Sequence, residues 1–111
     1  MPTIAEGTWD VSVNGYEGEL IFSIGGHGKV TGTIQLADLP VFKIEGWAGP
    51  VAGPDAIFFM RFDENDDPVQ GFSGYVFRGP NAQTSTIGGT ASFVGVGRPY
   101  TGIFGWFATA R

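Results

Sequence analysis

The side chains that could carry chemistry are few and scattered along the chain. There is one histidine, His27, and there is no cysteine. His27 lies in a Gly-Gly-His-Gly run, and the tip of a hairpin is a poor place to fix the general base of a Ser-His-Asp arrangement. The pattern therefore predicts a turn residue at His27, and a single histidine without cysteine offers no cluster for zinc.

An acidic run, Asp63-Glu64-Asn65-Asp66-Asp67, places oxygen ligands at alternate positions, as at the start of a calcium loop. Pro68 stands where such a loop needs glycine, and the distal glutamate is missing. We therefore predict a solvated acidic hairpin and no metal site. The glycine-rich runs Gly25–Gly28 and Gly95–Gly102 do not predict phosphate loops, because no helical pattern follows either.

Acid–base catalysis in a dry lumen would have to use isolated carboxyl or phenol groups. No two of the available groups have a spacing that marks a catalytic pair. We therefore predict no catalytic residue and no cofactor, while a small barrel enzyme of the cyclase or isomerase type stays open as an alternative. The available groups are Asp10, Glu17, Glu19, Tyr75 and Tyr100.

Length and charge restrict the classes of protein that need consideration. The 111 residues form a single domain, residues 1–111, and 42% hydrophobic with 15% charged residues is typical of a folded chain. A net charge of −5 disfavours nucleic acid as a partner. No apolar run approaches the ~18 residues that span a bilayer. The start, MPTIAEGTWD, lacks the pattern of a signal peptide, so we expect a cytoplasmic protein with no membrane partner.

Eight segments alternate between β-branched or aromatic residues and polar ones, and glycine- and proline-rich turns separate them. No segment has a helical period. Short connectors imply antiparallel hairpins, and closure into a barrel removes both sheet edges. We therefore predict an all-β, eight-stranded antiparallel up-and-down (meander) barrel in preference to a sandwich. The segments are Gly7–Val13, Gly18–Ile24, Lys29–Leu36, Val41–Ala48, Ala56–Asp63, Val69–Arg78, Thr84–Val94 and Tyr100–Ala110.

The inward side chains of such a barrel would form an aromatic and aliphatic lumen, because Trp9 carries Val11 and Val13 inward with it. This lumen predicts a pocket for a small, largely hydrophobic molecule, and inward glycines at 32, 46 and 74 are expected to leave volume unoccupied. The alternative is a lumen filled by its own side chains. The predicted ligand-binding residues are Trp9, Phe22, Ile34, Gln70, Phe72, Tyr75, Phe104 and Trp106.

Two segments, Ala56–Met60 and Ile103–Phe107, are apolar on both faces. Two dry faces suggest that a second subunit covers the outside, so we predict a homo-oligomer, either a dimer or a tetramer. A loop or terminus folded over that face is the alternative. Trp47, in phase with Lys43 and Glu45, is predicted to be exposed, and a lectin-like interaction module also stays open.

Part of the chain resembles the avidin and streptavidin family. The matching residues are Gly7-Thr8-Trp9 in the first segment and the run Gly28–Thr33 at the third, with a strand of suitable length, Glu19–Ile24, between them. Weaker matches are Ile44-Glu45-Gly46 and Phe72-Ser73-Gly74. A Gly-X-Trp on a first strand also occurs across the wider calycin superfamily. The resemblance implies an avidin- or lipocalin-like barrel with tetramer-like packing.

The sequence departs from this family where the family binds biotin. Ile34 stands where the family has a tyrosine, and Val11 stands where it has a polar ligand residue. The fifth to seventh segments contain no tryptophan, and the chain reaches Arg111 without the aspartate of the family's last strand. These departures argue against biotin as the ligand.

Overall fold

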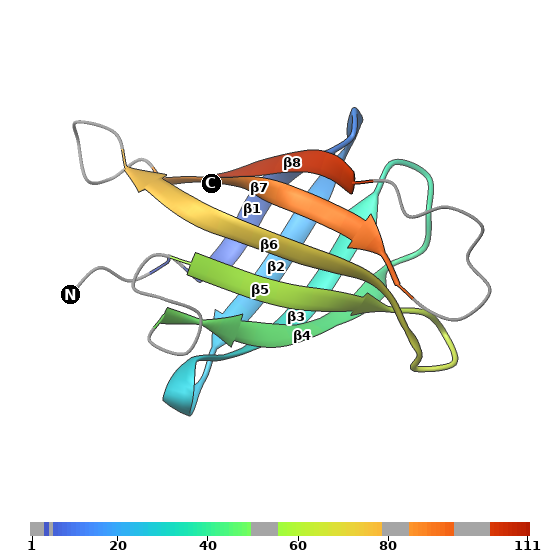
Figure 1. Ribbon diagram of the computed structural model, residues 1–111, viewed down its shortest axis with the longest axis horizontal. Coiled ribbons are helices and arrows are strands. Elements are labelled where there is room, and N and C mark those ends of the chain that lie inside the picture. Colours follow the sequence, from blue (N-terminus) through green and yellow to red (C-terminus); the bar gives the residue numbers. More distant parts are fainter. Residues whose placement is uncertain (1–3, 5, 50–55, 79–84, 95–102) are drawn as a thin grey trace.

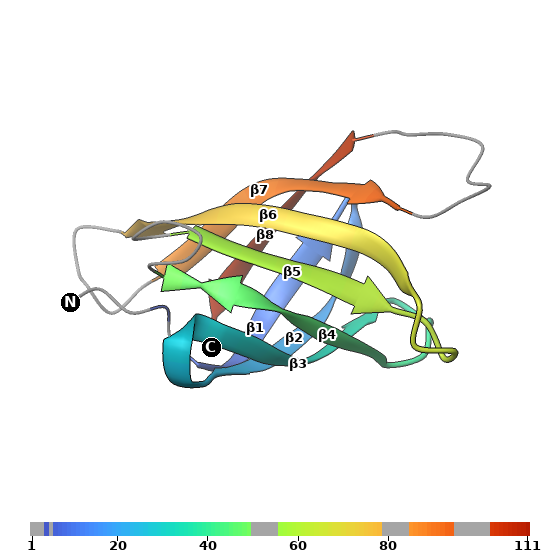
Figure 2. The same cartoon turned by 60° about the horizontal axis from the view of Figure 1, so that its bottom comes forward.

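Eight antiparallel strands follow one another around a closed barrel (Figure 1). The computed structural model describes residues 4, 6–49, 56–78, 85–94 and 103–111. Each strand pairs with the next, and β1 pairs with β8 to close the sheet (Figure 2). The predicted meander barrel is confirmed. The strands are β1 Gly7–Val13, β2 Tyr16–Ile24, β3 Lys29–Leu36, β4 Phe42–Ala48, β5 Ala56–Phe62, β6 Pro68–Arg78, β7 Ser85–Phe93 and β8 Ile103–Ala110.

The turn between β1 and β2 makes β2 longer than predicted. Asn14 and Gly15 both have positive φ angles, 49° and 87°, and Val13 pairs directly with Tyr16. This is the two-residue hairpin whose twist matches that of the strands. The predicted start of the second strand at Gly18 was therefore two residues late, because so tight a turn lets pairing begin at Tyr16.

The seam between the first and last strands is closed by a terminal ion cluster as well as by the β-ladder. The Arg111 Nη2 atom lies 2.7 Å from Asp10 Oδ1 and 2.9 Å from Glu19 Oε2. Hydrogen bonds to Asp10 and then Glu19 raise the pKa of Arg111. Because these groups are exposed, the cluster adds little to stability on its own.

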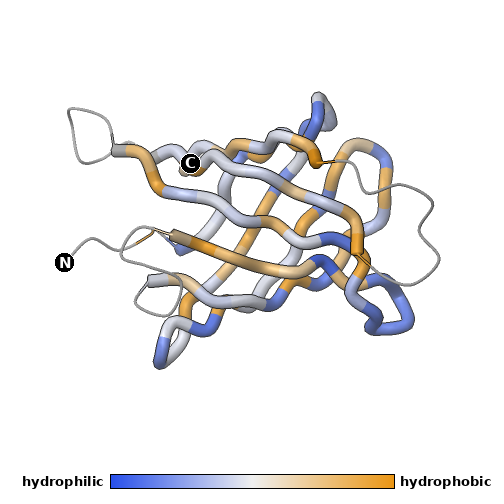
Figure 3. The backbone as a smooth tube through the Cα atoms, viewed as in Figure 1, coloured by the Kyte–Doolittle hydropathy of each residue, from blue (hydrophilic) through white to orange (hydrophobic). Residues whose placement is uncertain are grey.

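Large aromatic side chains fill much of the lumen. Trp9 stacks on Phe22 with their ring centroids 6.0 Å apart. The Phe59 and Phe72 rings stack at 4.7 Å, and Trp106 meets each of them edge-on at 5.6 Å. The Trp106 indole N–H donates to the carbonyls of Ser73 and Thr90, both at 3.1 Å, so its polar atom is satisfied inside the barrel. Hydrophilic segments lie mainly in the turns (Figure 3).

The inward glycines do not leave empty volume, and that expectation was wrong. A Cβ atom at Gly32 would lie 1.9 Å from the Ile21 carbonyl oxygen, and one at Gly46 would lie 1.9 Å from that of Phe58. At Gly74 it would lie 2.7 Å from Cζ2 of Trp106. The space is therefore taken by the backbone of the neighbouring strand or by the tryptophan ring. These glycines allow close packing and add nothing to a cavity.

Substituting a close-packed glycine should therefore destabilise the barrel. We expect Gly32→Ala to lower the free energy of unfolding by about 3 kcal/mol, because the backbone of β2 must move to admit the methyl group. Urea unfolding followed by tryptophan fluorescence measures the change. Gly105→Ala is the matched control, since nothing lies within 4 Å of a Cβ atom there. Equal unfolding curves for the two variants would contradict the packing argument.

Candidate functional site

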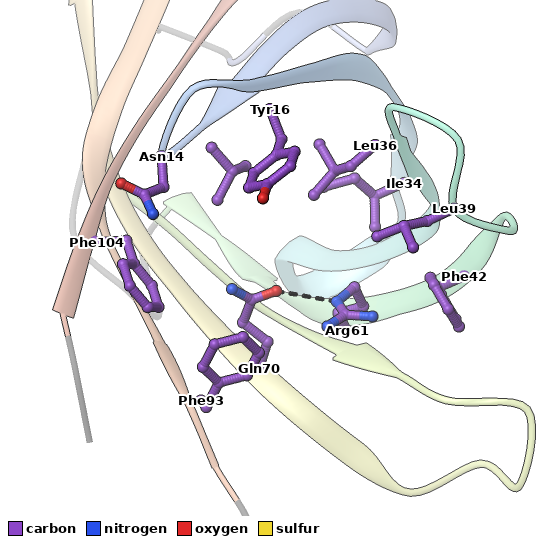
Figure 4. A pocket seen from close by; sticks show the side chains of 11 residues that line it. Asn14, Tyr16, Ile34, Leu36, Leu39, Phe42, Arg61, Gln70, Phe93 and Phe104 are labelled. Carbon is purple, nitrogen blue, oxygen red and sulfur yellow. Dashed lines mark hydrogen bonds between the residues drawn. The ribbon is translucent and has the colours of Figure 1, made fainter. Parts of the chain in front are cut away.

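A pocket of about 400 Å³ opens at one end of the barrel (Figure 4). This end, the mouth, is where β1, β3, β5 and β7 finish and where β2, β4, β6 and β8 begin. Most of the lining is apolar, and four of its side chains carry polar groups, namely Asn14, Tyr16, Arg61 and Gln70. The described residues that line it are Val13, Asn14, Tyr16, Ile34, Leu36, Leu39, Phe42, Arg61, Gln70, Phe93 and Phe104.

A β-bulge lies next to the most buried polar group of the pocket. The register between β5 and β6 shifts after Arg61, which pairs with Gln70, while Phe62 pairs with Pro68. The extra residue, Val69, and its neighbour Gln70 are both buried, although consecutive strand residues normally face opposite sides. Gln70 lies two residues before the inward Phe72, so ordinary alternation places it in the mouth, and the bulge buries the extra residue Val69 beside it.

Arg61 and Gln70 form a fixed polar pair in the pocket wall. The Arg61 Nε atom donates to Gln70 Oε1 at 3.0 Å, and Gln70 is only 4% exposed. The guanidinium carbon lies 4.7 Å from the centroid of the Phe42 ring. Because the Gln70 carbonyl oxygen faces Arg61, its amide nitrogen is turned away from the arginine, as Figure 4 shows. The pair is held by a charge-assisted hydrogen bond and a cation–π contact.

The hairpin between β1 and β2 supplies the remaining polar groups. Asn14 and Tyr16 flank the glycine of the tight turn, and their side chains line the pocket opposite Gln70 (Figure 4). The Asn14 backbone N–H donates to the Gly105 carbonyl at 3.0 Å, which ties this hairpin to β8. The turn that lengthened β2 therefore also positions one side of the pocket.

The predicted site residues separate into three groups. Ile34, Gln70 and Phe104 line the pocket, and their contact with a ligand stays a prediction. Tyr75 is 63% exposed on the outer face, since it lies three residues from the inward Phe72 and so in the opposite phase. The others belong to the buried core beneath the pocket, namely Trp9, Phe22, Phe72 and Trp106.

Several residues that line the pocket were not predicted from the sequence. Arg61 lies two positions after the buried Phe59, so it belongs to the inward side of β5. The sequence alone does not show this, because both faces of β5 are apolar and the inward side cannot be told from the outward one. Tyr16 was missed because the second strand was started too late. The missed residues are Asn14, Tyr16, Leu36, Leu39, Phe42, Arg61 and Phe93.

The candidate acid–base groups in the described chain point away from the pocket. Asp10 and Glu19 bind Arg111 on the outer face, and Glu17 is exposed. Tyr100 lies outside the described residues. The pKa of Lys43 is raised by its hydrogen bond to Asp66, and neither of these residues lines the pocket.

The two turn motifs are used for local structure. Asp63 Oδ1 accepts from the backbone N–H groups of Asn65 at 2.9 Å and Asp67 at 3.0 Å, which closes the acidic hairpin. His27 has a φ of 61° in the short 3₁₀ turn Gly26–Gly28. Among the described residues no three His, Cys, Asp or Glu side chains gather as metal ligands. No helix in the described part of the chain is long and apolar enough to cross a membrane.

Comparison with known proteins supports the fold. No protein-family model and no curated protein matches the sequence. Solved structures do match, and they place the chain among the eight-stranded meander barrels with an avidin-like fold. The rhizavidin–biotin complex is 16% identical, with a TM-score of 0.65 over 97% of this chain and 93% of that chain.

Two crystal forms of apo shwanavidin are similar to the same degree. They are 17% and 18% identical, with TM-scores of 0.66 and 0.65, and cover 99% and 100% of this chain and 98% and 100% of theirs. The avidin-like fold predicted from the first strands is thus confirmed.

The buried polar pair should contribute measurably to stability. We expect Gln70→Leu to lower the free energy of unfolding by about 2 kcal/mol, because Arg61 loses the acceptor of its Nε–H. Gln35→Leu is the control, since Gln35 is exposed and makes only a long 3.4 Å bond to the Leu39 carbonyl. That change should stay within about 0.5 kcal/mol. Urea denaturation compares the two variants. Equal losses in the free energy of unfolding would show that the buried pair stabilises the protein no more than an exposed glutamine does.

Proposed function

We propose that this protein binds a small, largely hydrophobic molecule in the mouth of its barrel, without catalysis and as a homo-oligomer. The observation that carries the proposal is the pocket itself. Its size of about 400 Å³ falls in the range of small-molecule sites, and its apolar lining with few polar groups is typical of them. The aromatic core beneath it restricts the ligand to the mouth.

The chemistry of the walls supports a ligand class other than biotin. Ile34 lines the pocket where the avidin family has a tyrosine, and Val11 is buried where that family has a polar residue. The solved rhizavidin structure holds biotin in a similar barrel. In this chain, aliphatic and aromatic side chains surround the corresponding space, so burial of an apolar body should supply most of the affinity.

Binding is favoured over catalysis by the direction of the acid–base groups. The candidate acid–base residues that the structure describes, including Asp10 and Glu19, face outward. The lectin-like alternative is weaker for a similar reason. Trp47 is 44% exposed, but the Lys29 ammonium already lies 5.4 Å from its ring centroid. A sugar stacking on that face of the ring would have to displace it.

A neutral hydrophobic dye tests the pocket. N-phenyl-1-naphthylamine should bind with increased, blue-shifted emission, because the mouth offers it a dry apolar site. Ile34→Trp should fill part of the pocket and weaken binding of the dye at least about tenfold, which corresponds to a loss of about 1.4 kcal/mol in binding free energy. Ile21→Trp, on the exposed face of β2, should bind like the wild type. If the dye stays dark with the folded wild type, the pocket proposal fails.

The outer surface of the barrel supports the oligomer. Charged side chains project outward from β1–β4, for example Asp10, Lys29 and Glu45. The outward positions within 58–62, 71–77, 86–92 and 103–109 on β5–β8 carry no Asp, Glu, Lys or Arg. Phe77 and Phe107 on this face are 60% and 54% exposed. Large exposed apolar side chains on an uncharged face are typical of a protein interface.

Two apolar side chains of this charge-free face lie close to glycines of the neighbouring strands. A Cβ atom at Gly71 would lie 3.3 Å from the Met60 sulfur, and one at Gly88 would lie 3.5 Å from the Phe77 ring. Met60 and Phe77 therefore pack beside these glycines, and Tyr75 and Ile103 on the same face are 63% and 73% exposed. A second copy of the same uncharged face is a suitable partner, since identical surfaces can pack about a two-fold axis.

Light scattering should accordingly report a dimer or larger assembly for the wild type. Phe107→Glu should weaken association at least about 100-fold, because a carboxylate would be buried in the interface at a cost of some 3 kcal/mol. Ile21→Glu adds the same charge to an exposed residue on β2, outside the charge-free face, and should leave the assembly intact. If the wild type is a monomer at every concentration, the proposal that a second copy covers this face is refuted.

A further inference from the structure

Gln70 is an unusual side chain for the wall of an apolar pocket. It is 4% exposed, and among the described residues it is the only buried one with a polar or charged side chain. Its neighbours across the sheet are Arg61 on β5 and Phe93 on β7, and both line the same pocket. The Phe93 ring meets that of Phe104 edge-on at 5.6 Å. The Gln70 amide therefore has the arginine on one side and an aromatic pair on the other.

The hydrogen bond from Arg61 fixes the direction in which this amide faces. Arg61 Nε donates to Gln70 Oε1 at 3.0 Å, so the amide nitrogen lies on the side away from the arginine (Figure 4). Turning the amide over would place its N–H groups against the N–H of Arg61 and break the bond. Gln70 therefore presents its two N–H donors, and not its oxygen, to the rest of the pocket.

The donating end of Gln70 opens on the cavity. Within the described part of the chain, no group accepts a hydrogen bond from its nitrogen, and no fully enclosed side-chain nitrogen or oxygen lacks a partner. The nitrogen is therefore not sealed inside the protein but reaches the pocket surface. Water can serve such a donor before a ligand binds. A ligand that displaces the water must supply an acceptor or leave a buried N–H unpaired.

The kind of acceptor follows from the groups that Gln70 has to offer. Its own oxygen is already bonded to Arg61, so a ligand hydroxyl would find no acceptor there for its proton. A carbonyl oxygen accepts a hydrogen bond and brings no proton with it. An ionised group also accepts, but its transfer from water into an apolar pocket costs far more than that of a neutral group. A neutral carbonyl meets both conditions.

We propose that the ligand is a small apolar molecule with a neutral carbonyl group, such as a ketone or an ester, whose oxygen accepts a hydrogen bond from the Gln70 amide. Its apolar body rests on the aliphatic and aromatic lining, including Ile34 and Phe104. This inference rests on the proposed function, because it concerns the same pocket.

The wild type alone provides a first test, with the compact apolar ketone 1-acetyladamantane as the probe. A hydrogen bond weakens the C=O bond, so the carbonyl stretching band of the bound ketone should lie at a lower frequency than in cyclohexane. Infrared difference spectra with the protein in excess measure the position of the band. A band at its cyclohexane position would show that the carbonyl meets no donor and would overturn the inference.

Competition assigns the hydrogen bond to its donor. In 1-isopropenyladamantane a CH₂ group replaces the carbonyl oxygen of the ketone, so the two compounds have nearly the same shape. Each is used to displace N-phenyl-1-naphthylamine, and the ratio of their dissociation constants is compared between proteins, which cancels their different hydration. Gln70→Glu keeps an oxygen for Arg61 and removes the donor. The ketone should therefore weaken at least about fivefold relative to the alkene, the effect of one neutral hydrogen bond.

Two further variants complete the comparison. Gln35→Glu makes the same chemical change at an exposed residue outside the pocket lining and should leave the ratio as in the wild type. Gln70→Met removes the amide without adding a charge, so the ratio should shift in the same direction as in Gln70→Glu. It takes the place of that variant if the added carboxylate prevents folding.

The outcomes separate the two proposals. If the dye does not bind the wild type, the pocket is not a binding site and both proposals fall. If the dye binds but the substitutions at Gln70 leave the ratio unchanged, only the carbonyl inference is overturned. The same holds if Gln35→Glu shifts the ratio as far as Gln70→Glu does, since the effect would then come from overall charge.

Discussion

The close approach of neighbouring backbones at glycine is the constraint on which this barrel depends. At Gly18, Gly32, Gly46 and Gly89 a Cβ atom would lie within 2 Å of a carbonyl oxygen on the adjacent strand. Strands that cross so closely can coil sharply enough for eight of them to close. Closure in turn fixes the width of the lumen. The large rings of the core then occupy most of it, and the pocket is what remains at the mouth.

The same arrangement of glycines shapes the outside. Where a glycine faces outward on β6 or β7, a long apolar side chain from a neighbouring position lies across it, as Met60 does at Gly71. The outward positions of β5–β8 named above carry no charged side chain, while charged side chains project outward from β1–β4. Glycines therefore allow close packing both between the strands and beneath side chains of the outer face.

How far the sequence predicts this molecule depends on whether the two faces of a strand differ. In β4, Phe42 and Ile44 alternate with Lys43 and Glu45, so the inward phase could be read directly and was confirmed. In β5 both faces are apolar, so the inward position of Arg61 was not apparent. The bulge at Val69 also escaped prediction, because it arises from pairing between strands and leaves no mark in the local sequence.

The Arg61–Gln70 pair is hard to explain by stability alone. Burying part of a guanidinium carries a desolvation cost, and two aliphatic side chains of similar size would fill the same volume without it. The pair instead stands beside a bulge, in the wall of the pocket at the mouth. A polar pair in such a place fits recognition better than packing.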